Sequence, residues 1–124
     1  MHRSLFLLWG PLLFACSSTI ENARKATILV NGNCEMCEET IEEAVVGNDH
    51  ARIEWDKQTR MAVITYDSLR TSLPNVLRRV ALAGYDNELW LAPDSSYERL
   101  PHCCRYDRTG RDILPPRGDE PMNH

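Results

Sequence analysis

The feature that most constrains the fold is the order in which hydrophobic patterns alternate between residues 26 and 92. Apolar residues at alternate positions indicate strands, and apolar residues three or four positions apart indicate amphipathic helices. Turn signals at 31–33 and 47–49 and a polar link at 56–60 separate these patterns. The expected elements are a strand at 26–30, a helix at 34–46, strands at 51–55 and 62–67, a helix at 72–83 and a strand at 87–92.

The resulting order, β-α-β-β-α-β, predicts an α+β domain. Two helices that cover one face of a four-stranded antiparallel sheet form the ferredoxin-like, split βαβ arrangement. A unit of about 67 residues buries only a limited core and is marginally stable alone. We therefore expect one small ferredoxin-like domain at 26–92, flanked by appendages.

The N-terminal segment has the pattern of an export signal. A short positive start is followed by an uncharged run at 5–15, which as a helix would cover about 16 Å and is too short to span a hydrocarbon core. We interpret 1–15 as a signal peptide. The sequence from Leu13 to Ser18 resembles the bacterial lipoprotein box, with Cys16 as the lipidated first residue and 16–25 as a tether. The alternative is an ordinary cleavage site with an incidental cysteine.

These features predict a lipoprotein anchored in a bacterial membrane on the periplasmic, extracytoplasmic side, where thiols meet an oxidising environment. Lys and Arg number 14 against 18 Asp and Glu, a net charge of −4. Nucleic acid is therefore not an expected partner, because phosphate binding requires a basic surface. The sequence has no Ser/His/Asp arrangement, no carboxylate pair with a pocket and no Gly-rich phosphate loop, so we expect no enzyme.

Cys34 and Cys37 form a Cys-x-x-Cys pair where the first strand passes into the first helix. We expect Cys34 on the loop and Cys37 in the first helical turn, where the positive end of the helix dipole favours thiolates. Two such sulfurs can converge on one ion, and soft thiolates select Cu(I), Zn(II) and heavier thiophilic ions. A closed structural zinc site needs four ligands. The pair therefore predicts an open site that binds a metal and passes it on by ligand exchange.

The segment from Val30 to Cys37, followed by an amphipathic helix and a hairpin, resembles the heavy-metal-associated domain, as does the ending at 83–86. The resemblance covers 26–92. It implies metal ligation by Cys34 and Cys37, with Tyr85 beside the metal loop. Family loops usually read Gly-Met-x-Cys-x-x-Cys, whereas this loop lacks the Met and is one residue shorter.

This family includes copper chaperones, domains of metal-transporting P-type ATPases and the periplasmic mercury-binding protein. The resemblance implies Cu(I) as the cargo, with Zn(II) or Hg(II) as alternatives. It also implies a metal-transporting ATPase or another metal-handling protein as partner. Two other functions stay open: a thiol–disulfide redox protein that uses the same pair, and a metal-independent interaction module.

The Pro-rich segment at 93–124 loses periodicity and is expected to be largely disordered, except near a His-Cys-Cys motif. His102, Cys103 and Cys104 cluster soft donors and predict a possible second metal site. Two alternatives are a tail that folds over the loop, so that four thiolates surround one ion, and a disulfide from the tail to Cys34 or Cys37. Met36 is a candidate thioether ligand, although intervening positions of such motifs commonly point away from the metal.

Overall fold

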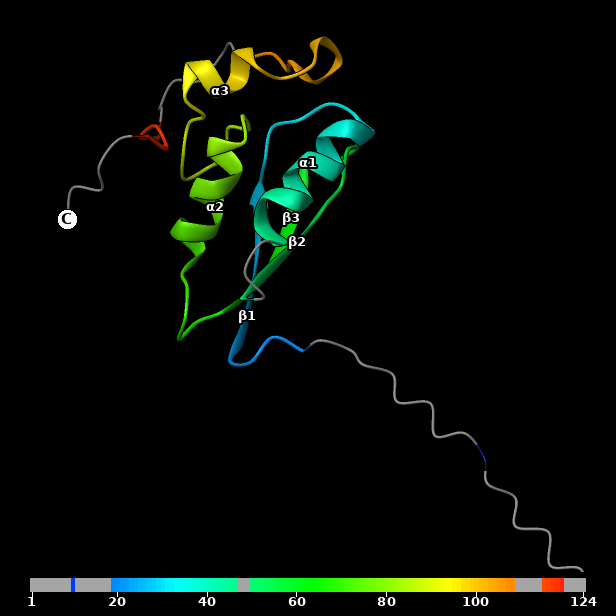
Figure 1. Ribbon diagram of the computed structural model, residues 1–124, viewed down its shortest axis with the longest axis vertical. Helices are drawn as coiled ribbons and strands as arrows, with labels where there is room; N and C mark the ends of the chain where they lie inside the picture. The colour runs from blue at the N-terminus through cyan, green and yellow to red at the C-terminus, as the bar shows by residue number, and fades with distance from the viewer. Residues whose placement is uncertain (1–9, 11–18, 47–49, 109–114, 120–124) are drawn as a thin grey trace, which may run out of the picture.

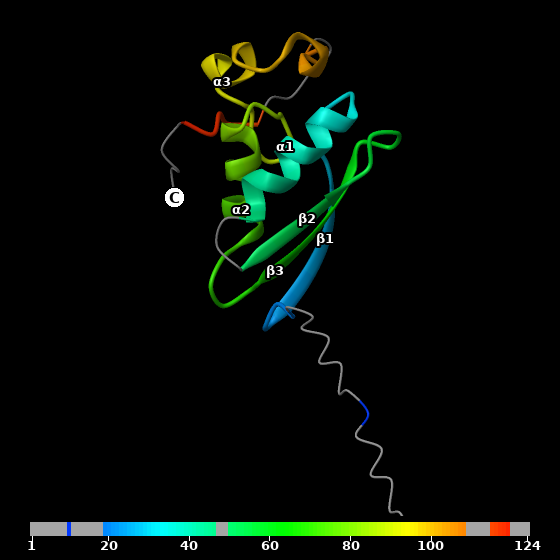
Figure 2. The same cartoon turned by 45° about the vertical axis from the view of Figure 1, so that its right-hand side comes forward.

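A three-stranded antiparallel sheet in the order β1-β3-β2 is the base of the fold. The computed structural model describes residues 10, 19–46, 50–108 and 115–119. Helices α1 and α2 lie side by side on one face of the sheet, and the C-terminal segment crosses their upper ends (Figures 1 and 2). The elements are β1 (Ala23–Leu29), α1 (Glu35–Val46), β2 (Ala51–Trp55), β3 (Met61–Asp67), α2 (Leu73–Leu82), α3 (Asp94–Glu98) and the 3-10 helix η1 (His102–Cys104).

Local signals account for the hairpin and for both ends of α2. The Asp56 carboxylate accepts hydrogen bonds from the backbone N–H groups of Gln58 (2.7 Å) and Thr59 (3.3 Å), which closes the predicted turn. Ser72 is the N-cap of α2 and accepts from the Asn75 N–H at 3.3 Å. Gly84 follows the helix with a φ of 115°, a conformation that favours glycine. The predicted hairpin and second helix are therefore confirmed.

The core lies between the sheet and the two helices. β2 alternates buried and exposed residues as the sequence predicts, so its apolar face packs inward. Fully buried side chains of α1 and α2 meet that face. The main aliphatic members are Ile41, Val45, Ile53, Ile64, Val76, Leu77 and Val80. This packing fixes the first turn of α1, and with it Cys37, against the end of the sheet.

The predicted fourth strand at 87–92 is wrong: the described residues contain no fourth strand. Asn87 makes a single bridge to Val30, at the edge where that strand would pair. The Asn87 side chain accepts from the N–H groups of Leu89 and Trp90, each at 3.0 Å, and folds the segment into a tight turn. The backbone of Leu91 pairs instead with residues 116 and 118. The backbone N–H and C=O groups of 87–92 that would pair with β1 therefore form hydrogen bonds within the turn and with residues 116 and 118.

Residues 93–108, which include the stretch around the His-Cys-Cys motif that was excepted from the expected disorder, fold onto the domain. Leu100, Cys104 and Tyr106 are buried. The Tyr106 hydroxyl accepts from the Asp86 N–H and donates to the Gly84 carbonyl, both at 2.7 Å. Segments 109–114 and 120–124 lie outside the described residues. Apolar and aromatic side chains among the prolines thus anchor the segment.

A buried ion pair holds the end of this segment. The Arg108 guanidinium donates to both oxygens of the Asp86 carboxylate at 2.9 Å and to the Ala92 carbonyl at 2.8 Å. Asp86 is only 1% exposed, so the paired charge stays out of water. The guanidinium also lies 4.7 Å from the centre of the Tyr97 ring.

The predicted signal peptide apart from residue 10, the lipidated Cys16 and the first residues of the tether, 16–18, lie outside the described residues. β1 begins at Ala23, so residues 23–25, expected to be tether, belong to the sheet. Within the part of the chain that the structure describes, no helix is both long enough and apolar enough to cross a bilayer.

Candidate metal centre

The loop between β1 and α1 places Cys34 and Cys37 as the sequence predicts. The Cys34 carbonyl accepts hydrogen bonds from the N–H groups of Cys37 (3.1 Å) and Glu38 (3.3 Å), so α1 starts directly after Cys34. The Asn31 N–H donates to the Asp86 carbonyl at 2.8 Å and ties the loop to the segment after α2. Cys34 is half-buried on the loop, and Cys37 is buried in the first helical turn.

Gly32 allows this loop to lie flat against the sheet. A Cβ atom at this position would lie 2.8 Å from the Trp55 ring and 3.3 Å from the Cys37 Cβ. The Trp55 indole donates to the Val30 carbonyl at 3.0 Å, which fixes the ring under the loop. A side chain at residue 32 would therefore push the loop away from Trp55 and move both cysteines.

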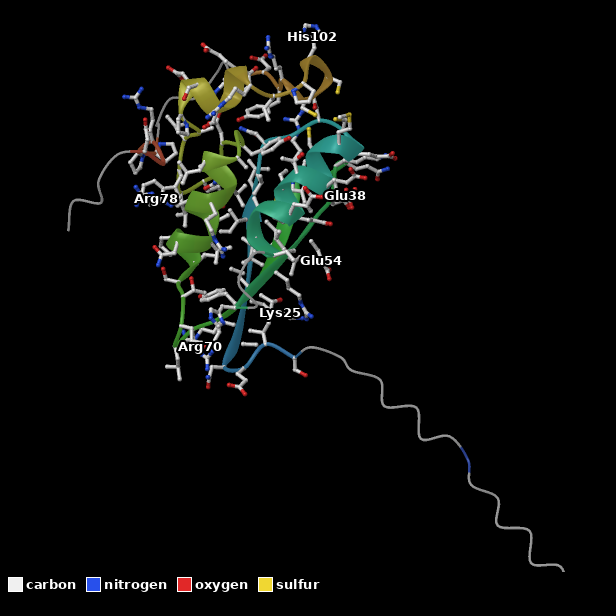
Figure 3. All side chains as sticks on the ribbon, in the orientation of Figure 1. Lys25, Glu38, Glu54, Arg70, Arg78 and His102 are labelled. Atoms are coloured by element: carbon white, nitrogen blue, oxygen red, sulfur yellow. The ribbon has the colours of Figure 1, made fainter. Side chains whose placement is uncertain are left out.

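Three thiol sulfurs converge at this end of the molecule. Cys34 Sγ lies 3.4 Å from Cys37 Sγ and 3.5 Å from Cys104 Sγ, and all three lie within 4.8 Å of one another. Cys104 comes from η1, which lies over the start of α1, where yellow sulfur atoms gather in Figure 3. Three ligands in a trigonal arrangement with metal–sulfur distances of about 2.3 Å would lie about 4.0 Å apart. The observed spacing is close to that geometry.

The four cysteines at 34, 37, 103 and 104 are free thiols. The separations of 3.4–3.8 Å between neighbouring sulfurs far exceed a disulfide bond of about 2.05 Å. The tail does fold over the loop, as one predicted alternative has it, but only Cys104 joins Cys34 and Cys37, so the cluster has three thiols and not the expected four.

The environment shifts the pKa values of the Cys34 and Cys104 thiols in opposite directions. Partial burial raises the pKa of Cys34. Four hydrogen bonds lower it by more: those from the backbone and side chain of Cys37, from the side chain of Cys104 and from the backbone of Met36. The pKa therefore falls below its ordinary value. Burial raises the pKa of Cys104, and its hydrogen bonds to the neighbouring thiols add to this shift. The pKa of Cys34 therefore lies below that of Cys104, and Cys34 ionises more readily of the two.

Tyr85, which the family resemblance places beside the metal loop, is fully buried there. Its hydroxyl has no hydrogen-bond partner among the described residues. Burial raises the pKa of the phenol strongly, and the Cys37 and Cys104 side chains add to the shift. The phenol ring stacks on Tyr106 with centroids 6.0 Å apart. An O–H donor without an acceptor, beside sulfurs that become anionic when they bind a metal, matches a site built for thiolates.

The predicted second site at His102, Cys103 and Cys104 does not form a separate cluster. Cys104 joins the inner sulfurs, whereas Cys103 and His102 are exposed. Cys103 Sγ lies 3.8 Å from Cys104 Sγ and donates to Met36 Sδ at 3.6 Å. The His102 side chain points outward at the top of Figure 3. Adjacent residues separate in this way because the turn of η1 directs one thiol inward and its neighbours toward solvent.

Asn33 contacts the cysteine cluster, although the sequence indicated only a turn at 31–33. Its side-chain oxygen accepts from the Cys37 thiol at 3.2 Å. Asn33 lies two residues before the first residue of α1, and no sequence signal paired its side chain with Cys37.

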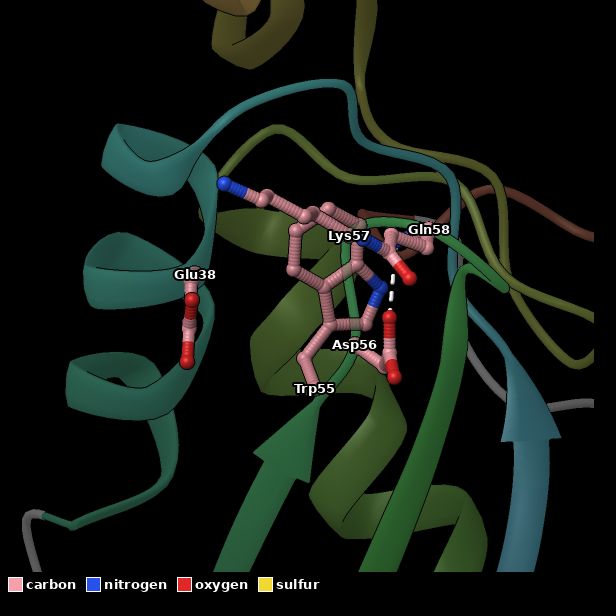
Figure 4. Close-up of a pocket in the computed structure, with 5 residues that line it drawn as sticks. All are labelled: Glu38, Trp55, Asp56, Lys57 and Gln58. Carbon is pink, nitrogen blue, oxygen red and sulfur yellow. Dashed lines mark hydrogen bonds between the residues drawn. The ribbon is translucent and has the colours of Figure 1, made fainter.

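Another surface hollow lies beside the β2–β3 turn and contains no sulfur. It measures about 360 Å³ and is lined by Glu38, Trp55, Asp56, Lys57 and Gln58 (Figure 4). Its charged groups face solvent, and Lys57 pairs with Glu35 at 2.8 Å. This hollow offers soft metals no ligand, so the cysteine cluster is the better candidate site.

Fold and site together define a small α+β protein with a three-thiol centre at one end of its sheet. No protein-family model matches the chain, and no curated protein is significantly similar to it. Among solved structures, the chain is similar to oxidised MerP from Ralstonia metallidurans CH34. The two are 28% identical, the match covers 53% of this chain and 94% of that chain, and the TM-score is 0.49. This similarity is too low to carry a functional assignment, and we base the function on the sulfur geometry of this chain.

Proposed function

We propose that this protein binds a thiophilic metal ion through Cys34, Cys37 and Cys104. The observation that carries the proposal is the convergence of three free thiols within 4.8 Å, two from the loop and one from η1. Hydrophobic packing alone would not require a buried Tyr85 hydroxyl without a hydrogen-bond partner beside them. Thiolate ligands at this spacing suit a soft ion in low coordination.

The number of ligands favours Cu(I) as the cargo. Structural Zn(II) sites are almost always four-coordinate, and no group of potential ligands among the described residues adds a fourth donor to these three. Hg(II) is the alternative soft ion, and Zn(II) would need a ligand from elsewhere. Because Cys37 and Cys104 are 0% and 1% exposed, the bound ion would be shielded from water, which suits transfer or sequestration rather than turnover.

The cellular setting is part of the same proposal. With Cys16 lipidated after removal of 1–15, the domain would be tethered outside the cytoplasm of a bacterium. A metal-transporting ATPase or another metal-handling protein would then supply or receive the ion. In this role the protein is a carrier or a trap and not an enzyme.

Thiol–disulfide exchange is the second candidate function. The 3.4 Å separation of Cys34 and Cys37 and the lowered pKa of Cys34 are features of redox-active pairs as well. Buried Cys104 favours the metal function, because it lies as close to Cys34 as Cys37 does and has no role in a two-cysteine exchange.

Metal titration of the reduced full chain distinguishes the two functions. We expect one Cu(I) bound per chain, and about 10- to 100-fold weaker binding after Cys34→Ser, Cys37→Ser or Cys104→Ser. The Cys103→Ser variant is the matched control, because its thiol lies outside the inner group. Failure of the reduced parent protein to bind Cu(I), Hg(II) or Zn(II) would refute the metal function. A measurable disulfide exchange activity that survives Cys104→Ser would then favour the redox alternative.

A further inference from the structure

We infer that Cys103 and Met36 form an outer sulfur pair through which a soft metal ion enters and leaves the inner three-thiol site. This inference rests on the proposed function and adds to it a separate binding position and a route. It is carried by the contacts between sulfur atoms and by the greater exposure of Met36 and Cys103 than of the inner cysteines.

The sulfur atoms form a continuous path from the surface to the core. Met36 Sδ contacts Cys103 Sγ at 3.6 Å, and Cys103 Sγ lies 3.8 Å from Cys104 Sγ. The path continues from Cys104 to Cys34 at 3.5 Å and from Cys34 to Cys37 at 3.4 Å. Every step is shorter than the roughly 4.6 Å that two sulfurs span when they bind one ion from opposite sides at about 2.3 Å each. An ion can therefore hold one sulfur while it bonds to the next.

The two outer sulfur residues are more exposed than the three inner cysteines. Met36 is 51% exposed and Cys103 is exposed, Cys34 is half-buried, and Cys104 and Cys37 are almost completely buried. The outer end opens into a shallow hollow of about 460 Å³, lined by Asn33, Cys34, Glu35, Met36, Lys57 and Cys103. The hollow gives a donor or acceptor of the metal access to the outer sulfurs, whereas the inner sulfurs of Cys37 and Cys104 do not line it.

Packing does not explain the outer pair. An exposed methionine and an exposed cysteine that touch each other remove little apolar surface from water, so their contact contributes little to folding. The contact also joins α1 to η1, two elements whose cysteines form the inner site. A thioether and a thiol together are weaker ligands than three thiols, because only the thiol gains negative charge when it binds. The outer pair would therefore bind the ion more weakly and release it inward.

The transfer is a series of ligand exchanges without electron transfer. A Cu(I) ion that binds the outer pair displaces the proton of the Cys103 thiol. The bond to Met36 breaks as the bond to Cys104 forms, and the bond to Cys103 breaks as bonds to Cys34 and Cys37 form. Each inner thiol that binds as a thiolate releases its proton to solvent, and Cys103 takes one back. Copper stays Cu(I) throughout, and the reverse sequence returns it to the surface.

The test compares the rate of metal release with the affinity. The full chain, carrying Cys16→Ser in every variant so that only the described thiols are present, is reduced and loaded with one equivalent of Cu(I). It is then mixed with excess bicinchoninate, and formation of the coloured Cu(I) complex is followed by stopped flow. We expect Met36→Leu and Cys103→Ser each to slow release by about tenfold or more, which corresponds to about 1.4 kcal/mol on the barrier. Equilibrium affinity should stay within about threefold of the parent protein.

Met61→Leu is the matched methionine control, because Met61 lies in β3 at the turn after β2 and not at the sulfur cluster. Its release rate should equal that of the parent. Parent-like rates in both outer variants would overturn the inference and leave the proposed function intact. A loss of affinity in Cys103→Ser as large as that in Cys104→Ser would also overturn it, because Cys103 would then be an inner ligand. Failure of the parent to bind Cu(I), Hg(II) or Zn(II) would instead overturn the proposed function itself.

Discussion

Replacing Tyr85 by Phe should weaken metal binding without weakening the fold. In the metal-free protein the buried hydroxyl has no hydrogen-bond partner among the described residues, and an unsatisfied buried group costs about 1–3 kcal/mol. Phe keeps the ring and its stacking on Tyr106, so no cavity forms. The metal-free variant should therefore be as stable as the parent or more stable.

The metal-bound protein should respond in the opposite direction. Once Cys37 and Cys104 are thiolates, the Tyr85 hydroxyl has an anionic acceptor, and hydrogen bonds to charged groups contribute about 1.5–3 kcal/mol. Loss of that bond predicts about 10- to 150-fold weaker Cu(I) binding. The assay is competition with a Cu(I) chelator, combined with thermal unfolding of the metal-free protein.

Tyr106→Phe is the control for this experiment. Its hydroxyl makes two hydrogen bonds of 2.7 Å, to the Asp86 N–H and the Gly84 carbonyl, so its removal should destabilise the metal-free fold by about 1–3 kcal/mol. The reasoning about Tyr85 is refuted if Tyr85→Phe lowers the stability of the metal-free protein and leaves the Cu(I) affinity unchanged.

Three further predictions concern the thiols and the segment that carries Cys104. The pKa of Cys34 is lowered and that of Cys104 is raised. Iodoacetamide at pH 7, below the ordinary thiol pKa of about 8.5, should therefore alkylate Cys34 well before Cys104. Peptide mapping by mass spectrometry measures the labelling of each, and equal labelling would contradict the prediction. Arg108→Ala leaves the buried Asp86 carboxylate without its ion-pair partner and should lower the free energy of unfolding by about 3 kcal/mol. Hydrogen exchange of the backbone amides across 93–108 should become faster. Unchanged exchange there would contradict the role of the ion pair. Gly84→Ala places a Cβ on a residue with a φ of 115° and only 2.8 Å from the Leu100 side chain. Denaturant unfolding should show a loss of about 2 kcal/mol or more in the free energy of unfolding. Stability equal to that of the parent would contradict the strain at this position.

Local patterns predicted most of the domain because the forces behind them act over a few residues. The alternation in β2, the Ser72 cap and the turn at 56–60 each depend on neighbours in the chain, and all appear in the structure. The run at 87–92 has the composition of a strand but does not form one. The conformation of 87–92 depends on the hydrogen bonds of the Asn87 side chain and on backbone pairing with 115–119. Hydrophobic periodicity carries no information about either.

For the candidate site, the sequence by itself determined where Cys34 and Cys37 lie. Their three-residue spacing at the start of a helix brings both sulfurs to the same end of α1. Only the tertiary structure decided that Cys104, 70 residues from Cys34, supplies the third sulfur and that Cys103 stays outside with Met36. That choice depends on the anchoring of 93–108 by Tyr106 and Arg108, because contacts between distant segments form only when their combined free energy exceeds the entropy lost in closing the chain.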